Sequence, residues 1–590
     1  MNLDTSDSSL LTSIRVVCRS HPQIYALDHV LQQLDALIFP SGRLTLPKCV
    51  QYNSIRLFIR VLKSLDSNKT QCEYEKLQQF RLAMYAAGNI GQLWMAQQLY
   101  GRYPAALNGA TALAAGTSGD LLMLQWVYEE KKHLMGVNSY AAVYKAFEYS
   151  RGDLNTVKWL VKTFPNVLFD VSIPAKEGHL EVVKWVLEQG KYWCNDHVAD
   201  DVAMRGDLEM MQFLVEHKLL DGQSSAPDLA AEFGHLNLVK WLSENKTKLS
   251  WRFTTDAMDR AAGEGHLEVV QWLHENESVC CTTGAMDLAA RSGHLNVLQW
   301  LHSSRREGCT ENAMDYAAMM GHLEVLQWLH VNETAGCTTA AINFAAYKGH
   351  LDVVRWIYET RNEGCTKLAM DWAAKAGRLD VVEWLHYHGE KCTDLAMDQA
   401  TANGHLEVVK FLHENRDEGC TKYALNVSAG NGDLSMVQWL LTHRSEGVIC
   451  EAINFAAGGG YLEVVKSLLN SSADTCSLRA LDTAAANGHL GVVQWLLENS
   501  GQQYSPAAMV GAAINCHSKV MKWLYKVYAW KIPTYAMMNS FATGDFEMLK
   551  FLLNTKQLDR HSVVAGRAMA AKSHQVEVMQ WLTENYSEVR

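Results

Sequence analysis

The chain has 590 residues, more than one hydrophobic core usually organises, and its 48% hydrophobic and 20% charged residues are typical of a globular protein. A formal net charge of −11, with no run of lysine and arginine, argues against a nucleic-acid partner. The first residues, MNLDTSDSSLLTSIRVV, lack a signal-peptide pattern, and no stretch of 18 apolar residues could span a membrane. We therefore expect a cytoplasmic protein, or a nuclear one, whose fourteen cysteines are reduced thiols.

The N-terminal residues 1–80 lack the repeat that fills the rest of the chain. Ile24–Ile38 (IYALDHVLQQLDALI) has the apolar spacing of an amphipathic helix. Pro47–Leu62 is expected to be a degenerate helix pair, with Asn53 between its helices. Because a repeat array must cover the apolar faces at its ends, residues 1–80 are predicted to form a helical cap. Residues 81–590 would then be the repeat array with its C-terminal cap.

A block reading A-M-D-x-A-A-x-x-G-H-L-E-V-V-x-W-L recurs along the chain. Cys516 and His574 take the place of its glycine in two blocks, which gives eighteen units, and twelve of the seventeen spacings are 28 residues. In the other blocks the repeat glycine is Gly91, Gly119, Gly152, Gly178, Gly206, Gly234, Gly265, Gly293, Gly321, Gly349, Gly377, Gly404, Gly432, Gly460, Gly488 and Gly544.

Each unit is expected to be a pair of short antiparallel helices. In the unit around Gly321, Ala313–Met320 has a small apolar face, and the glycine suits the left-handed residue that ends a helix. His322 is predicted to be the N-cap of the second helix, because other units hold aspartate there, and Glu324 suits the helix dipole. Thirteen units have tryptophan seven residues after the glycine, as at Trp328, and we expect these indoles in the core. Helices this short must pack against neighbouring units, which predicts an all-α solenoid.

The pattern resembles ankyrin repeats, through segments such as AAGEGHLEVV at Ala261–Val270 and ANGHLEVV at Ala402–Val409. The resemblance implies an ankyrin-type solenoid that binds protein or peptide partners. The usual ankyrin unit has about 33 residues, so short loops are expected here in place of projecting hairpins, with one hairpin retained near Lys131–Ser139. Asp315 stands where the family has histidine, and we expect it to accept backbone hydrogen bonds at the start of its helix.

Histidine and cysteine also recur, and they raise the question of a metal site. One cysteine column has the repeat period: Cys194, Cys281, Cys309, Cys337, Cys365, Cys392, Cys420 and Cys476. Equivalent atoms in neighbouring units should lie roughly 8–10 Å apart, too far for a disulfide or a shared zinc ion. We interpret the column as small, mostly buried residues. A pair such as His330 and Cys337 supplies two ligands where structural zinc needs four, so no metal or cofactor is predicted.

No catalytic residues are predicted either, because no nucleophile with an orienting base recurs and no phosphate-binding loop is present. In a solenoid, binding uses exposed positions of successive units on the concave face. Positions five, two and one before the repeat glycine vary, and they supply a cluster of aromatic and methionine side chains typical of interfaces. The candidate partner-binding residues are Tyr316, Met319, Met320, Phe344, Tyr347 and Trp372. The alternative is that they fill the core.

The functional prediction is a monomeric, non-catalytic scaffold or adaptor that binds a protein or peptide on the concave face, away from membranes. One alternative is a targeting adaptor that recruits a second partner through residues 1–80. An alternative of another class is a metal- or redox-responsive protein that uses the His/Cys pairs between repeats.

Overall fold

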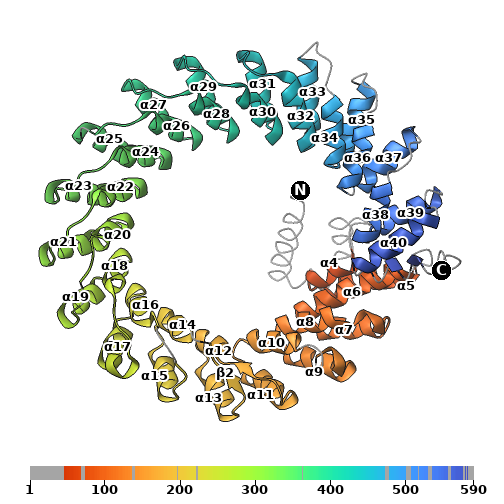
Figure 1. Cartoon of the computed structure of the whole chain (residues 1–590), viewed down its shortest axis with the longest axis horizontal. Coiled ribbons are helices and arrows are strands. Elements are labelled where there is room, and N and C mark those ends of the chain that lie inside the picture. Colours follow the sequence, from red (N-terminus) through yellow and green to blue (C-terminus); the bar gives the residue numbers. More distant parts are fainter. Residues whose placement is uncertain are drawn as a thin grey trace, which may run out of the picture. The chain divides into compact units, whose positions relative to one another are not determined.

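The computed structural model describes residues 45–582 except 68–72, 136–139, 196, 221–223, 279, 362, 472–477, 500–505, 516, 529–533, 556–557, 559, 574, 576–577 and 580. The expected all-α architecture of stacked antiparallel helix pairs is confirmed within these residues, and Figure 1 shows the pairs in sequence. The helix expected over Ile24–Ile38 lies outside them.

Each repeat contributes a first helix and a second helix. The first helices are α4 (Leu46–Gln51), α6 (Glu73–Asn89), α8 (Gly109–Ser118), α10 (Ala141–Glu148), α12 (Ser172–Lys176), α14 (Val198–Arg205), α16 (Ala226–Glu232), α18 (Thr255–Gly263), α20 (Gly284–Ser292), α22 (Glu311–Met320), α24 (Thr339–Lys348), α26 (Lys367–Lys375), α28 (Asp394–Ala402), α30 (Lys422–Asn431), α32 (Ile449–Gly459), α34 (Leu478–Ala486), α36 (Pro506–Ile514), α38 (Thr534–Thr543) and α40 (Arg560–Lys572). The second helices are α5 (Ile55–Ser67), α7 (Leu93–Tyr100), α9 (Leu121–Glu130), α11 (Leu154–Thr163), α13 (Leu180–Glu188), α15 (Leu208–Glu216), α17 (Leu236–Leu249), α19 (Leu267–Asn276), α21 (Leu295–Ser304), α23 (Leu323–Asn332), α25 (Leu351–Thr360), α27 (Leu379–Tyr387), α29 (Leu406–Asn415), α31 (Leu434–His443), α33 (Leu462–Asn470), α35 (Leu490–Asn499), α37 (Ser518–Tyr528) and α39 (Phe546–Asn554).

The array divides into two compact units near α18. The first unit contains residues 1–261 and 266–280, and the second contains residues 262–265 and 281–590. Within the second unit, each first helix packs on the first helix of the next repeat, as α22 does on α24 and α24 on α26. The buried side chains of α22 explain this close approach, because alanine dominates them. In Figure 1 the even-numbered first helices of this unit share one side and the odd-numbered second helices the other.

A threonine and a glycine delimit a typical first helix. In α22, the side chain of Thr310 caps the helix by accepting from the backbone N–H of Asn312, and Gly321 ends it with φ 83° in the left-handed region. The helix therefore starts at Glu311, two residues before the Ala313 expected from the sequence, because the threonine of the G-C-T segment is its cap. The predicted apolar face is confirmed, since Ala313 and Met314 are fully buried.

The first unit departs from the regular pattern around α12. A hairpin was expected near Lys131–Ser139, but the described part of this segment forms a 3-10 helix, η2 (Lys132–Leu134); residues 136–139 lie outside the described part. Another 3-10 helix, η1 (Pro104–Ala106), precedes α8. The described strands are β1 (Phe169–Asp170) and β2 (Tyr192–Trp193), which pair in parallel. β1 lies where other repeats have the start of the first helix, which leaves α12 short.

The helix pair expected over Pro47–Leu62 is present as α4 and α5. Asn53 lies between them with φ 51°, the conformation that the repeat glycines adopt elsewhere. Leu57 and Phe58 of α5 are buried. The role of residues 1–80 as a cap stays a prediction.

The aspartate column accepts hydrogen bonds at a helix start, as predicted, but the helix belongs to the next repeat. Asp371 Oδ1 accepts the backbone N–H of Thr393 at 2.8 Å, and its Oδ2 accepts the Thr393 hydroxyl at 2.8 Å. Asp315 does the same with Thr338. Burial raises the pKa of Asp371, although its bonds to Thr393 act in the opposite direction. Each aspartate therefore connects two repeats.

The prediction that the repeat histidines cap the second helix with their side chains is wrong. His322 occupies the N-cap position of α23 but makes no capping hydrogen bond, whereas Asp433 at the same position of α31 accepts from Met436 N. A Cβ built on Gly293, in the preceding repeat, would lie 2.7 Å from the His322 ring. The histidine therefore packs on the glycine turn of its neighbour. His489 likewise contacts the preceding repeat, with its Nε2 atom at hydrogen-bond distance, 3.0 Å, from Gly458 O.

The repeated tryptophans are not core residues, with the exception of Trp126, which is 8% exposed. Trp328 and Trp356 are half-buried on the outer side of the second helices. The His302 ring contacts Trp328 edge to face, with centroids 5.4 Å apart, and His330 contacts Trp356 at 5.6 Å. The core positions of this helix are occupied instead by residues such as Leu326, on the opposite side of the helix. The indoles thus join second helices along the array.

Candidate partner-binding surface

The six candidate residues lie on three successive first helices of the second unit. Tyr316, Met319 and Met320 are on α22, Phe344 and Tyr347 on α24, and Trp372 on α26. Met320 is 44% exposed and Tyr347 36%, and the other four are half-buried. The fully buried positions of these helices are occupied instead by residues such as Ala317 and Ala345. None of the six is therefore a fully buried core side chain.

Three of the six come together in an aromatic cluster, defined as Phe344, Tyr347 and Trp372. The Phe344 and Trp372 rings are tilted with centroids 5.4 Å apart, and the Tyr347 ring meets Trp372 edge to face at 6.4 Å. Tyr316 contacts a different group, because the Arg291 guanidinium lies 6.0 Å from its ring centroid. The cluster joins α24 to α26 and leaves part of each ring accessible.

The charged side chains beside the cluster are cationic. Lys348 lies 5.8 Å from the Tyr347 ring centroid, and Lys375 is exposed at the end of α26. With Arg291, they give this area a positive charge within a chain of net charge −11. Aromatic rings edged by cations can bury an apolar side chain and pair with a carboxylate next to it.

Sequence reasoning missed three exposed apolar residues that lie nine positions before the repeat glycine. Leu368 of α26, Leu395 of α28 and Tyr423 of α30 are 41%, 48% and 47% exposed. Leu368 is four residues before Trp372, so the two side chains share a helix face. The threonine before each of these helices could have predicted them. If Thr366 is taken as the N-cap, the helix starts at Lys367 and includes Leu368. The exposed apolar surface therefore extends beyond α26.

An arginine side chain lies between the members of the His330 and Cys337 pair. Arg361 Nη1 lies 3.0 Å from His330 Nδ1, and the same guanidinium contacts Cys337, so a cation already occupies the space between them. Glu363 pairs with Arg361 at 2.5 Å. Burial raises the pKa of the Cys337 thiol to about 11. Among the described residues, no group of three or more His, Cys, Asp or Glu side chains could hold a metal ion.

The cysteine column is a structural feature, as interpreted from the sequence. Cys281, Cys337 and Cys392 are 5%, 5% and 3% exposed, Cys309 is half-buried, and Cys476 lies outside the described residues. No disulfide joins the ten cysteines of the described residues.

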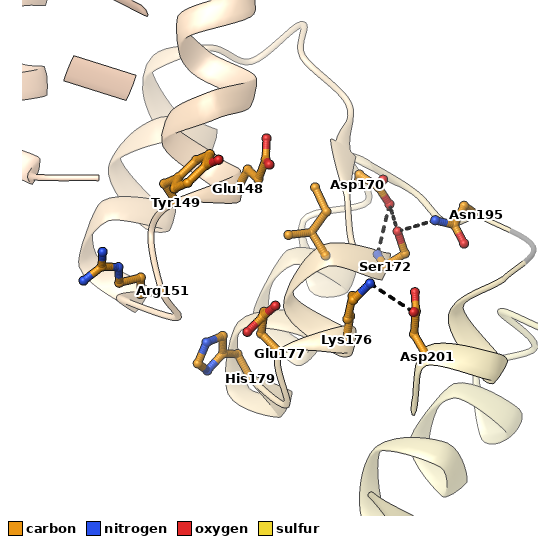
Figure 2. A pocket seen from close by; sticks show the side chains of 11 residues that line it. Glu148, Tyr149, Arg151, Asp170, Ser172, Lys176, Glu177, His179, Asn195 and Asp201 are labelled. Carbon is orange, nitrogen blue, oxygen red and sulfur yellow. Dashed lines mark hydrogen bonds and ion pairs between the residues drawn. The ribbon is translucent and has the colours of Figure 1, made fainter. Parts of the chain in front are cut away.

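A separate hollow of about 820 Å³ lies in the first unit, beside the short helix α12 (Figure 2). Ser172, Asp170 and His179 line it, which are residue types of hydrolytic sites. However, the Ser172 hydroxyl pairs with Asp170 and accepts from Asn195 at 2.9 Å, and Figure 2 shows His179 well apart from it. Lys176 pairs with Asp201 at 3.1 Å. Ser172 therefore contacts no histidine in this hollow, and the serine–histidine pair of a hydrolytic site is not formed.

No described helix has both the length and the apolar character needed to cross a bilayer.

The likeness to known proteins lies in the repeats. The model described as "Ankyrin repeats (many copies)" matches residues 228–274, 258–302 and 286–330, and that described as "Ankyrin repeats (3 copies)" matches residues 314–396, 397–477 and 425–508. No curated protein is similar enough to match the chain.

Solved structures of pentatricopeptide repeat proteins also match. One is PPR10 in complex with an 18-nt psaJ RNA element, 11% identical over 88% of this chain and 90% of that chain, with a TM-score of 0.32. Another is PPR10 from maize, 10% identical over 99% and 93%, with a TM-score of 0.27. TM-scores this low carry no information on function. The helix pairs and the family-model matches show that residues 228–508 of the chain are an array of ankyrin repeats.

Proposed function

We propose that the chain is a non-catalytic scaffold that binds a segment of a partner protein on the first helices α22, α24 and α26. A repeat array of this family is a binding scaffold, and the proposal adds the surface that binds. The aromatic cluster carries it: rings from neighbouring repeats are in contact with each other and still partly exposed. Soluble proteins rarely leave contiguous apolar surface open without a partner.

The surroundings of the cluster support a protein ligand. Met320 and Leu368 extend the apolar area, and flexible methionine with rigid aromatic rings is the composition of interface hot spots. The net charge of −11 is unfavourable for a phosphate backbone. Free thiols throughout the array fit a reducing compartment, and we place the protein in the cytoplasm as a monomer.

Affinity purification from cells, with wild type compared to the double variant Tyr347→Ala/Trp372→Ala, tests the proposal. Proteins recovered with wild type and lost with the variant are the candidate partners, and binding is then measured with purified components. We expect a loss of at least tenfold in affinity, because two hot-spot rings are removed.

Tyr387→Ala is the matched control, because Tyr387 is 74% exposed on the second helix α27. It should leave binding unchanged. The proposal fails if the double variant binds every partner as wild type does. It also fails if that variant loses binding only because it unfolds, which thermal melting would reveal.

A further inference from the structure

Four exposed asparagines follow the first helices of the second unit at the same repeat position. Asn403, Asn431, Asn487 and Asn515 each come directly before the repeat glycine or, for Asn515, before Cys516. All four are exposed. We call them the asparagine row. The position between Asn431 and Asn487 is Gly459, so the row has one gap.

Three of these asparagines connect neighbouring repeats through a single N–H group. Asn431 Nδ2 donates to Ala402 O at 2.8 Å, Asn487 Nδ2 to Gly458 O at 2.7 Å, and Asn515 Nδ2 to Ala486 O at 2.7 Å. The acceptors lie in the last turn of a first helix, where carbonyls have no partner within the helix. This hydrogen bond holds each carboxamide in one orientation and uses one of its two N–H groups. The Oδ1 atoms make no hydrogen bond within the described chain.

The surface next to the row is open. The residue two before the glycine is small in four successive repeats: Ala402, Gly430, Gly458 and Ala486. Between α32 and α34 this leaves a hollow of about 460 Å³, lined by residues that include Phe455 and Asn487. Phe455, which lines one side of this hollow, is 55% exposed.

The fold does not require a glycine at position 458. A Cβ there would lie 3.6 Å from Asn487 Nδ2 and 3.8 Å from Thr483 Cβ, which are ordinary contacts. Glycine inside a helix is less favourable than alanine. The missing side chain therefore has one visible effect in the described structure, which is to keep the hollow open.

The row matches an extended main chain in chemistry and in spacing. A carboxamide offers one donor and one acceptor, as a peptide unit does. Packed helices lie roughly 8–10 Å apart, which sets the distance between neighbouring asparagines. A polyproline II segment advances about 9 Å in three residues and leaves its N–H and C=O groups unpaired. An α-helix has those groups paired internally, and a β-strand repeats every two residues, about 6.6 Å.

We propose that the first-helix surface from α28 to α36 binds an extended, polyproline-II-like segment of a partner protein through its main chain. Every third residue of the segment pairs with an asparagine of the row, and one apolar side chain enters the hollow beside Phe455. Four repeat steps from Asn403 to Asn515 correspond to about twelve residues. Glu451 and Arg479 also line the hollow, and Glu451 pairs with Lys422 at 3.3 Å.

The inference rests on the proposed function in taking a polypeptide as the ligand, but it uses different residues. The probe is a phage-displayed library of random 12-residue peptides, panned against the full chain. The best peptide is resynthesised with blocked ends, and its Kd is measured by fluorescence anisotropy. We expect Asn431→Ala/Asn487→Ala to weaken binding at least tenfold.

The matched control is Asn415→Ala/Asn499→Ala, because these exposed asparagines donate to carbonyls of their own second helices at 2.8 and 3.0 Å. It should bind as wild type does. Gly458→Leu fills the hollow from a position the fold tolerates, and it should also weaken binding at least tenfold. N-methylation of the peptide should reduce affinity at every third residue only.

The inference is refuted if no peptide is enriched on wild type over the row variant, or if N-methylation shows no three-residue period. Loss of binding in Tyr347→Ala/Trp372→Ala alone would refute it too, while leaving the proposed function intact. Peptides that bind every one of these variants as they bind wild type would refute both.

Discussion

Asp371 provides the sharpest test of how the repeats are held together. Its carboxylate is 2% exposed and accepts both the N–H and the hydroxyl of Thr393, the cap of the next first helix. Asp371→Ala removes both acceptors at once. Leaving shielded donors unpaired costs about 1–3 kcal/mol, and a weakened cap adds to this. We expect a local destabilisation of about 3 kcal/mol between α26 and α28.

Asp371→Asn should be far milder, because the chain already contains that arrangement. Asn343 bonds the Thr366 hydroxyl at 3.0 Å and accepts the Thr366 N–H at 3.3 Å. The carboxamide is also easier to bury, since burial raises the pKa of Asp371 and so opposes its ionised form. We expect less than about 1 kcal/mol for this change.

Hydrogen exchange followed by mass spectrometry is the suitable assay, because a long repeat array does not unfold in one step. A destabilisation of about 3 kcal/mol should accelerate exchange at the start of α28 roughly a hundredfold. Asp380→Ala, at an exposed position in the first turn of α27, is the control and should change little. If Asp371→Ala exchanges as slowly as Asp371→Asn, the coupling argued from these bonds is wrong.

Further predictions concern the glycine turns and the thiols. Gly321→Ala should lower the local stability around α22 and α23, measured by the same hydrogen-exchange assay, by about 2 kcal/mol or more, since its φ is 83° and its Cβ would lie 2.7 Å from the His350 ring, whereas Gly458→Ala should be neutral or stabilising by about 1 kcal/mol. Burial lowers the pKa of His350, so the folded state favours the neutral ring. The stability that this gives is present above about pH 6.5 and lost as pH falls through the folded pKa, and His350→Gln should flatten this pH dependence of the exchange protection of α25. Cys337, whose pKa burial raises to about 11, should react with iodoacetamide at pH 8 far more slowly than exposed Cys280; equal rates would contradict its burial.

Features that recur within one repeat could be predicted from the sequence. The helix pair, the left-handed Gly321 and the buried Ala313 depend on residues close together in the chain, and the repetition of the block made each signal unambiguous. The candidate surface was predicted in part, because Tyr347 and Met320 occupy positions outside the apolar stripe. Leu368 was missed because the helix was taken to start two residues too late.

The errors share one physical cause. His322 packs on Gly293, Trp328 contacts His302, and Asp315 bonds Thr338, and in each case the partner belongs to a neighbouring repeat, 23 to 29 positions away. Pattern reasoning within one unit assigned these side chains to the nearest role available, a cap or a core position. Sequence periodicity shows that a position recurs but does not show what the next copy of the repeat presents to it.

Contacts between neighbouring repeats also help to distinguish structural positions from candidate functional ones. A side chain that bonds or packs onto the next repeat, as Asp371 does, cannot change without a matching change in its partner. Phe455 is 55% exposed, and its position, five before the repeat glycine, holds different side chains in different repeats. Asn487 belongs to both groups, since its N–H holds Gly458 O and its oxygen remains available. A residue fixed by the fold on one side and free on the other is preorganised for binding, which is why we propose the exposed face of the first helices as the binding surface.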